Sequence, residues 1–185
     1  MDFEKLAIDG AWIGRSAVHT DERGIFREWF KADDLEVFSG TKFNVAQANV
    51  SVSHQGVLRG IHYSNAPSGQ GKWITCVSGA IWDVVVDLRP KSETYKKWIG
   101  LSLTGSSGDV LYISEGLGHA FLTLRDNSIV SYLLTSAYSP QDEYEINPFD
   151  PDINIAWPIS NPRMSPKDGT APNLATRFEQ GNLPC

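Results

Sequence analysis

The chain has 185 residues, 41% of them hydrophobic and 21% charged, a composition typical of one globular domain. Its formal net charge of −6 argues against a nucleic-acid-binding protein, which would present a basic face. No apolar run approaches the roughly 20 residues of a membrane-spanning helix, and the N-terminus lacks the basic and apolar regions of a signal peptide. We therefore expect a cytoplasmic protein with no membrane or nucleic-acid partner.

An anionic small ligand is compatible with this acidity, because a few arginines and lysines in one cleft can outweigh the overall charge locally. The two cysteines have neither a redox spacing nor a metal-binding spacing. Cys76 lies in an apolar run and Cys185 is the last residue, so we predict no disulfide between them.

One helix is predicted near the N-terminus, over residues 31–40. Asp33 and Asp34 lie in its first half, where the helix dipole favours negative charge. Gly40 is placed to end the helix.

Short β-type runs follow, from about residue 43 to residue 134. Each is rich in Val, Ile, Thr and aromatic residues and is bounded by turn-forming residues. They cover residues 43–53, 57–63, 72–78, 80–89, 97–104, 109–114, 119–126 and 128–136. Many short strands with little helix between them predict an all-β sandwich, jelly roll or barrel. From about residue 160 to residue 185 the chain is rich in Pro, Gly and Asn, and we expect an extended tail that packs on the barrel or stays loose.

The first of these runs alternates between apolar and polar residues. Its odd positions are Gln47, Asn49, Ser51 and Ser53, and its even positions are Ala or Val. Taken alone, this pattern favours a half-buried strand with the polar side chains in water. The neighbouring runs also hold polar residues among strongly apolar ones, which favours a polar cleft inside a barrel instead.

Two carboxylates lie in the apolar run 80–89, where an unpaired buried charge would be costly. Asp87 is close to Arg89, and we interpret it as an ion-pair anchor. Asp83 has the same structural interpretation, with the less favoured alternative that it orients a histidine of a functional site.

Arg59 and His62 are three residues apart, so a regular strand would place them on opposite faces. Gly60 between them could host a bulge that turns both side chains toward one cavity. A lone histidine in an apolar strand is more often a core residue, but Arg59, Gly60 and the nearby Lys72 favour a site here. The same two interpretations stay open for His119, which follows a Gly-rich turn.

Tyr132 lies among Ile, Val and Leu residues, and it is either a core aromatic or part of a site together with Tyr138. The four histidines are His19, His54, His62 and His119. Because no two of them are spaced as His-x-His, a metal site of three histidines, or of two histidines and a carboxylate, is disfavoured. The chain also has no P-loop and no Rossmann glycine motif for a nucleotide.

Several long motifs resemble those of the dTDP-4-dehydrorhamnose 3,5-epimerase family, in unbroken order and over nearly the whole chain. They are DERGIFREWF (21–30), QANVSVSHQGVLRGIHY (47–63), QGKWITCVSGAIWDVVVDLR (70–89), SEGLGHAFLTL (114–124), SYLLTSAYSP (131–140), DPDINIAWP (150–158) and SPKDGTAP (165–172). The resemblance implies one epimerase domain over residues 1–185, with a double-stranded β-helix (cupin jelly-roll) fold and a few short helices. It also implies a homodimer with strand exchange near the N-terminus, and no metal or organic cofactor.

The resemblance assigns roles to individual residues. His62 matches the general base, Asp168 its carboxylate partner, Tyr132 the general acid, and Lys72 the group near the C4 carbonyl oxygen. The residues that match substrate-contact positions are Arg23, Glu28, Gln47, Asn49, Arg59, Lys72, His119, Tyr138, Glu143 and Lys167. Among them, Tyr138 matches an aromatic residue that stacks on the thymine.

The activity implied is that of an isomerase of carbohydrate biosynthesis. It would invert C3 and C5 of dTDP-4-dehydro-6-deoxy-D-glucose, through an enolate, to give dTDP-4-dehydro-L-rhamnose. Ala48, Leu133 and Ala137 depart from the commonest family pattern, and they leave the extent of the reaction open. One alternative is therefore a 3-only or 5-only epimerase of an antibiotic deoxysugar pathway. Another is a non-catalytic cupin that binds a sugar nucleotide, although such a protein has no need of the four predicted catalytic residues together.

Overall fold

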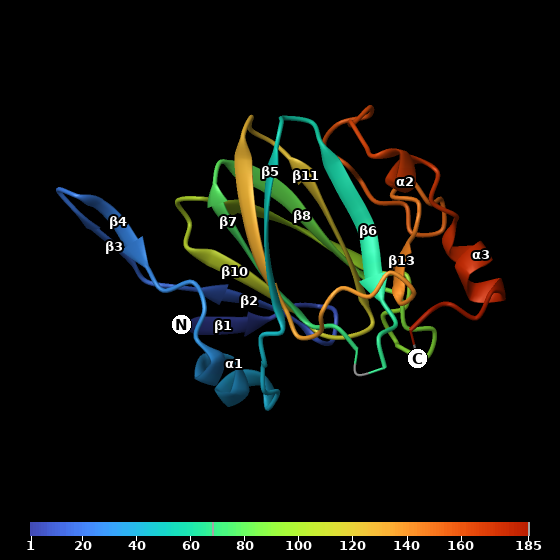
Figure 1. The fold of residues 1–185 in the computed structure, drawn as a ribbon, viewed down its shortest axis with the longest axis horizontal. Helices are drawn as coiled ribbons and strands as arrows, with labels where there is room; N and C mark the ends of the chain where they lie inside the picture. The colour runs from blue at the N-terminus through green and yellow to red at the C-terminus, as the bar shows by residue number, and fades with distance from the viewer. Residues whose placement is uncertain (68, 185) are drawn as a thin grey trace.

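The computed structural model describes residues 1–67 and 69–184, and within them two antiparallel sheets face each other (Figure 1). The first sheet has six strands in the order β1 (Asp2–Lys5), β2 (Ala11–Arg15), β10 (Asp109–Ile113), β7 (Lys72–Ser78), β12 (Ser128–Leu134) and β5 (Gln47–Ser53). The second has five, in the order β13 (Glu143–Glu145), β6 (Leu58–Ser64), β11 (Leu117–Thr123), β8 (Ala80–Asp87) and β9 (Trp98–Thr104). From β5 to β13 the chain alternates between the two sheets except at the β8–β9 hairpin, as in a jelly roll. The predicted all-β jelly-roll fold is therefore confirmed.

The interior of the sandwich is apolar and takes side chains from both sheets. Ile74 of β7 and Val130 of β12 come from the six-stranded sheet, whereas Val85 of β8 and Phe121 of β11 come from the five-stranded sheet. All four are at most 4% exposed. Each of the eight predicted β-type runs overlaps one of the strands β5 to β12, and six of the runs contain their strand entirely.

Helix α1 (Ala32–Ser39) forms where the sequence predicts it, within one residue at each end. Gly40 ends it with a left-handed φ of 68°, a conformation that glycine adopts without steric cost. Leu35 is fully buried and packs with Trp73 of β7 and Tyr112 of β10. The helix thus covers the outer face of the six-stranded sheet.

The C-terminal tail packs on the outer face of the five-stranded sheet. Leu174 and Leu183 are buried in one cluster with Ile61 of β6 and Val84 of β8. The prediction of an extended tail is wrong in part, because α2 (Pro166–Gly169) and α3 (Leu174–Glu179) are helical. Both are short turns whose stability comes from this packing, which explains why composition alone indicated extended chain.

Strand β5 presents its polar side chains to the interior of the sandwich. Val50 and Val52 on its other side are 68% and 58% exposed, whereas Ser53 is buried and Gln47 is half-buried. The interpretation of a polar cleft inside the barrel is therefore correct, and the apolar side of this edge strand faces outward.

A two-stranded hairpin, β3 (Val18–Asp21) and β4 (Gly24–Arg27), projects away from the body of the molecule (Figure 1). It carries the exposed side chains of Ile25 and Phe26. The sequence did not predict β1 to β4 or β13, which are three to five residues long and lack a sustained period-2 pattern.

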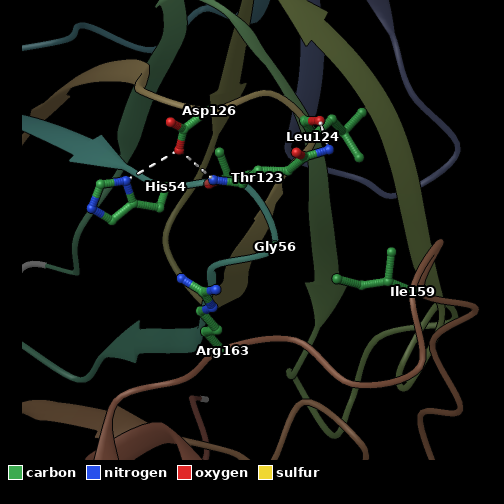
Figure 2. A pocket seen from close by; sticks show the side chains of 8 residues that line it. His54, Gly56, Thr123, Leu124, Asp126, Ile159 and Arg163 are labelled. Carbon is green, nitrogen blue, oxygen red and sulfur yellow. Dashed lines mark hydrogen bonds and ion pairs between the residues drawn. The ribbon is translucent and has the colours of Figure 1, made fainter.

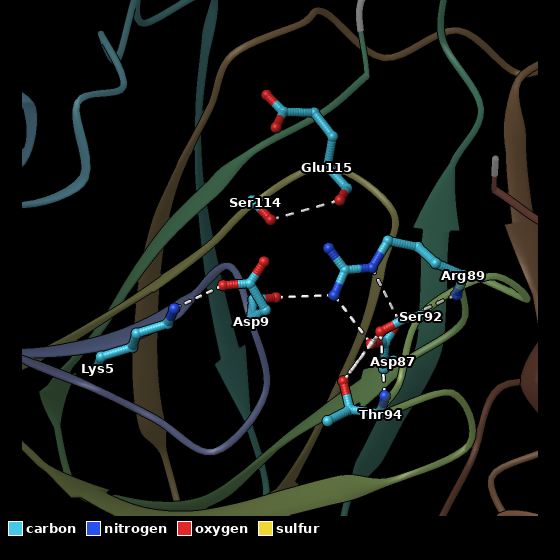
Figure 3. A network of polar contacts seen from close by, with 8 residues as sticks. All are labelled: Lys5, Asp9, Asp87, Arg89, Ser92, Thr94, Ser114 and Glu115. Atoms are coloured by element: carbon cyan, nitrogen blue, oxygen red, sulfur yellow. Dashed lines mark hydrogen bonds and ion pairs between the residues drawn. The ribbon is translucent and has the colours of Figure 1, made fainter.

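The carboxylate of Asp87 anchors the end of β8 (Figure 3). It accepts hydrogen bonds from Arg89 Nε at 2.9 Å and from the hydroxyls of Ser92 and Thr94. Arg89 also donates to the backbone carbonyl of Asp9 at 2.8 Å, which ties this end of β8 to the β1–β2 turn. The interpretation of Asp87 as an ion-pair anchor is confirmed.

Among residues 1–67 and 69–184, no helix is both long and apolar enough to cross a membrane. Cys76 is buried as a free thiol. Cys185 lies outside the described residues, and so does the prediction about a disulfide with it.

Candidate active site

A cleft of about 280 Å³ opens at one end of the sandwich, between the two sheets and the C-terminal tail. Its lining residues are Gln47, Asn49, Arg59, His62, Gln70, Lys72, Tyr132, Leu134, Tyr138, Glu143, Tyr144, Ser165, Lys167 and Asp168. All four residues predicted to be catalytic are among them, together with six of the other residues predicted to contact substrate.

The imidazole of His62 is paired with the carboxylate of Asp168, with 2.6 Å between Nε2 and Oδ1. A carboxylate only accepts hydrogen bonds, so Nε2 carries the hydrogen of this bond. In the neutral imidazole the lone pair is then on Nδ1. The pairing fixes both the tautomer and the orientation of a candidate base.

Helix α2 brings Asp168 to this position. The hydroxyl of Ser165 accepts the backbone N–H of Asp168 at 3.0 Å, and Pro166 occupies the first turn, two features that favour a helix start. Burial raises the pKa of Asp168. Hydrogen bonds from His62, Ser165 and the backbone of Gly60 lower the pKa by more than burial raises it, so the pKa lies below its usual value. Asp168 is thus held as a carboxylate.

A bulge in β6 turns Arg59 and His62 to the same cleft. His62 pairs with His119 of β11, and Arg59 pairs with Phe121. The two pairs are three residues apart on β6 but two residues apart on β11, so β6 contains one extra residue. Gly60 has a φ of 112°, and a Cβ there would lie 2.5 Å from the backbone oxygen of His119. The predicted bulge at Gly60 is confirmed, and only glycine fits the position.

Tyr132 and Lys72 reach the cleft from the opposite sheet. Both belong to the six-stranded sheet, on β12 and β7, whereas His62 belongs to the five-stranded sheet. In the described part of the chain, neither the Tyr132 hydroxyl nor the Lys72 ammonium makes a hydrogen bond to another side chain. Burial lowers the pKa of Lys72, and the negative charge of Glu143 opposes this shift. Both polar groups are therefore available to a ligand.

A second histidine–carboxylate pair lies beside the first. His119 is directly opposite His62 on the neighbouring strand, and its Nε2 is 2.9 Å from both carboxylate oxygens of Asp83. Burial raises the pKa of Asp83, and the interaction with His119 opposes this shift. The interpretation of Asp83 as a hydrogen-bonded ion-pair anchor fits this pairing. That it orients a histidine of the functional site stays a prediction, because His119 does not line the cleft.

A loop over residues 135–142, which we name the Tyr138 loop, joins β12 to β13 at the mouth of the cleft. Gln47 of β5 accepts the backbone N–H of Tyr138 at 2.8 Å and donates to Asn49 at 2.9 Å. The Tyr138 ring is 59% exposed. Gln47 thus positions a neighbouring aromatic residue in addition to lining the cleft.

Three residues predicted to contact substrate do not line the cleft. Arg23 lies at the tip of the β3–β4 hairpin, where it pairs with Asp21. Glu28 lines a separate small hollow near the N-terminus. His119 is paired with Asp83 behind His62. Their substrate contacts stay predictions.

The sequence did not single out Gln70, Leu134, Tyr144 and Ser165, which also line the cleft. Gln70 precedes Lys72 by two residues, so strand alternation would have placed both on one side. Ser165 before Pro166 is a helix-start signal that the Pro-rich composition of the tail masked.

A larger, shallower hollow of about 750 Å³ lies at the other end of β5 (Figure 2). It contains His54, which pairs with Asp126 at 3.1 Å, and the exposed Arg163. Exposed pairs of this kind contribute little free energy, and none of the predicted site residues lies there. In residues 1–67 and 69–184, no three His, Cys, Asp or Glu side chains are grouped so as to hold a metal ion. The expected absence of a metal stays a prediction.

Comparison with known proteins gives the family. The sequence profile of the dTDP-4-dehydrorhamnose 3,5-epimerase family matches residues 5–176. The dTDP-4-dehydrorhamnose 3,5-epimerase of Mycolicibacterium smegmatis is 44% identical over 100% of this chain and 91% of its own length. The crystal structure of NovW, a 4-keto-6-deoxy sugar epimerase of Streptomyces spheroides, is 42% identical and superposes with a TM-score of 0.96 over 100% of this chain and 92% of NovW.

ChmJ, a 3′-monoepimerase from Streptomyces bikiniensis, is 45% identical and superposes with a TM-score of 0.93 over 97% of this chain and 91% of ChmJ. The relatives therefore include enzymes named for inversion at two centres and at one. They agree with the jelly-roll fold and with an isomerase activity. The chain belongs to the dTDP-4-dehydrorhamnose 3,5-epimerase family and is a sugar-nucleotide epimerase.

Proposed function

We propose that the protein inverts C3 and C5 of dTDP-4-dehydro-6-deoxy-D-glucose, giving dTDP-4-dehydro-L-rhamnose, with His62 as base and Tyr132 as acid. The observation that carries this proposal is the placement of the two groups on opposite sheets of one cleft. Epimerisation needs a base on one face of the sugar and an acid on the other, because proton return from the same face restores the starting centre. A sugar ring lying between the sheets meets that requirement.

Proton removal beside a ketone requires stabilisation of the enolate oxygen that forms. Lys72 is 7% exposed, lines the cleft and has its ammonium free of other described side chains. A cation fixed in a water-poor site stabilises charge as it develops, and this electrostatic contribution is large in enzymes. Lys72 therefore holds the C4 oxygen during both inversions. C3 and C5 both flank C4, so one His62–Tyr132 pair serves both centres after the ring adjusts.

The nucleotide part of the substrate binds toward the mouth of the cleft. Arg59 supplies a guanidinium suited to bidentate hydrogen bonds with a diphosphate, and Tyr138 stacks on the base. Lys167 adds a second cation, although in the free protein it pairs with Glu145 at 3.0 Å. An epimerase relative from Legionella pneumophila was solved with dTDP-4-keto-L-rhamnose, which supports this substrate class.

Relatives also support the two proton-transfer residues. ChmJ was solved as a double mutant in which one histidine and one tyrosine are replaced, in complex with dTDP. His62 and Tyr132 have the same separation along this chain as that pair has in ChmJ. The pairing of His62 with Asp168 and the free hydroxyl of Tyr132 fit the same roles.

The enzyme works as a homodimer in the cytoplasm, and the β3–β4 hairpin reaches the partner subunit. Ile25 and Phe26 of the hairpin and Val50 of β5 are 58%, 66% and 68% exposed, which supports an apolar contact with a second copy. Such an arrangement also gives Arg23 a route to the partner's diphosphate. A monomer in analytical ultracentrifugation at micromolar concentration would contradict the dimer.

The test is incubation with dTDP-4-keto-6-deoxyglucose in deuterated water, with C3 and C5 followed by NMR. We expect deuterium at both positions and accumulation of the L-rhamno product. Exchange at C3 alone would mean that the protein inverts C3 only, the activity named for ChmJ. Nucleotide binding without any exchange would favour the non-catalytic alternative.

A further inference from the structure

Gln70 has a buried side chain that joins the two ends of the Tyr138 loop. It is 4% exposed, and its Nε2 donates to the hydroxyl of Ser136 at 3.2 Å and to Oε1 of Glu143 at 3.2 Å. Ser136 is near the start of the loop, and Glu143 is the first residue of β13 after it. One amide group thus connects two segments that are adjacent in space and separated by the loop.

The orientation of this amide is fixed by its partner. A carboxylate only accepts hydrogen bonds, so the nitrogen of Gln70 rather than its oxygen must face Glu143. Both of its N–H groups are then used, one on each end of the loop. Loss of a hydrogen bond to a charged group, such as the half-buried Glu143 carboxylate, costs more than loss of one between neutral groups.

Other contacts hold the Tyr138 loop at single points. Gly71 and Thr135 exchange two hydrogen bonds at its start, and Gln47 holds the backbone of Tyr138 in its middle. At its end, the backbone N–H of Asn65 donates to the carbonyl of Asp142. Gln70 differs from these contacts because it joins start and end directly.

Glu143 also acts on Lys72. Burial lowers the pKa of Lys72, and the charge of Glu143 counteracts this effect. The Glu143 carboxylate therefore helps to keep a buried ammonium charged, provided that it stays in place. In the cleft, Gln70 donates to this carboxylate through its side-chain amide.

We infer that Gln70 is a positioning residue that clamps the Tyr138 loop and fixes the Glu143 carboxylate beside Lys72. This role rests on the proposed function, because Lys72 and Tyr138 act there on the ketone and on the base of the nucleotide. Gln70 itself has no need to touch the reacting atoms. It couples the nucleotide end of the cleft to the end where the proton transfers take place.

The first test measures the clamp directly and needs no substrate. In Gln70→Met, a side chain of similar length loses both donors, and we expect faster amide hydrogen–deuterium exchange, read by mass spectrometry, in peptides covering residues 135–143. The matched control is Gln141→Met, since Gln141 is an exposed residue of the same loop. Unchanged exchange in Gln70→Met would overturn the clamp, whatever the activity of the protein.

A second variant covers the case that Gln70→Met does not fold. Gln70→Glu keeps the shape of the side chain but replaces the donor to Glu143 by a like charge, so we expect even faster loop exchange at pH 8. Thermal unfolding followed by circular dichroism identifies the folded variants. If the Tyr138 loop exchanges as slowly in Gln70→Glu as in the unmodified protein, the inference is also overturned.

The second test is a double-mutant cycle on the rate of solvent-deuterium incorporation into the substrate. Alone, Gln70→Met should lower the rate about tenfold, and in the Glu143→Ala background it should lower it less than about twofold, because residues acting through each other are not additive. If the effects of Gln70→Met and Glu143→Ala on the rate multiply in the double variant, Gln70 does not act through Glu143. Lack of incorporation by the unmodified protein would contradict the proposed function, and loop exchange would still decide the clamp.

Discussion

His62 and Asp168 are 106 residues apart in the sequence, and their side chains meet at 2.6 Å in the cleft. The histidine comes from a central strand and the carboxylate from a one-turn helix in the C-terminal tail. Orientation of the candidate base therefore depends on tail packing as well as on the strands.

Replacement of Asp168 by Asn should leave the fold intact and lower the rate of substrate deuteration on the order of 10²- to 10⁴-fold, the upper value being the loss when the carboxylate partner of a catalytic histidine becomes an amide. The physical reason is that an amide can stabilise the wrong tautomer of His62. Asp126→Asn is the matched control, since Asp126 pairs with the exposed His54 far from the cleft. Equal rates for the two variants would show that Asp168 does not orient the base.

Lys72→Met should lower the deuteration rate on the order of 10²- to 10³-fold, because the enolate loses its electrostatic partner. Binding of dTDP, which lacks the ketone, should change little, and calorimetry measures it. Lys97→Met, at an exposed position, is the control for loss of one positive charge. If dTDP binding falls as far as the rate does, Lys72 serves the nucleotide instead.

Tyr132→Phe should separate the two proton transfers. The base can still remove a proton in this variant, so NMR should detect residual deuterium exchange, whereas inverted product should be lost to a greater extent. Tyr95→Phe is a control with the same chemical change outside the cleft. Inversion at the unmodified rate in Tyr132→Phe would refute the acid role.

Gly60→Ala should disturb the bulge that carries Arg59 and His62. Its Cβ would lie 2.5 Å from the His119 carbonyl oxygen, and its φ of 112° is unfavourable for alanine. We expect a lower unfolding temperature and weak activity. Gly169→Ala, where a Cβ has no neighbour within 4 Å, is the control, and a stable, active Gly60→Ala protein would contradict this account.

The Asp87 anchor predicts a pH dependence of stability. Burial raises the pKa of Asp87, but hydrogen bonds from Arg89, Ser92 and Thr94 outweigh this and hold it at about 2, against an ordinary 3.8. A lowered folded-state pKa stabilises the protein above the unfolded-state value, and the contribution is lost as the pH falls from about 4 toward 2.

Asp87→Asn should therefore lower the free energy of unfolding by about 2 kcal/mol at pH 7, and by much less near pH 2.5. Urea denaturation at the two pH values measures the difference. Asp21→Asn removes the exposed partner of Arg23, and it should leave the urea denaturation midpoint unchanged at both pH values. If Asp87→Asn lowers the free energy of unfolding by the same amount at pH 2.5 and at pH 7, the assignment is refuted.

Much of the fold was predictable from local pattern. The β-type runs gave β5 to β12 because Val, Ile, Thr and aromatic residues alternate there between clear turn residues. Helix α1 was predictable from Asp33, Asp34 and Gly40. Strands β1 to β4 were missed because they are only four or five residues long. β1, β3 and β4 are largely exposed, and β2 is buried through its pairing with the distant strand β10.

The site was predictable only in part from the residues themselves. The glycine between Arg59 and His62 indicated the bulge, but periodicity left Tyr132 as a core residue, and the family motif was needed to place it in the cleft. Gln70 escaped because its two partners lie 66 and 73 residues further along the chain. Contacts over such separations depend on how the sheets stack, which strand patterns do not specify.

Because the candidate base and acid come from different sheets, the spacing of those sheets, about 10 Å in a typical sandwich, sets how far apart their backbones lie. Core side chains such as Ile74 and Val85, against which Tyr132 packs, thus act as spacers for the proton-transfer pair. The volume of the hydrophobic core becomes a determinant of which ring shapes the enzyme accepts. A core substitution that changes this spacing is then expected to alter turnover as well as stability.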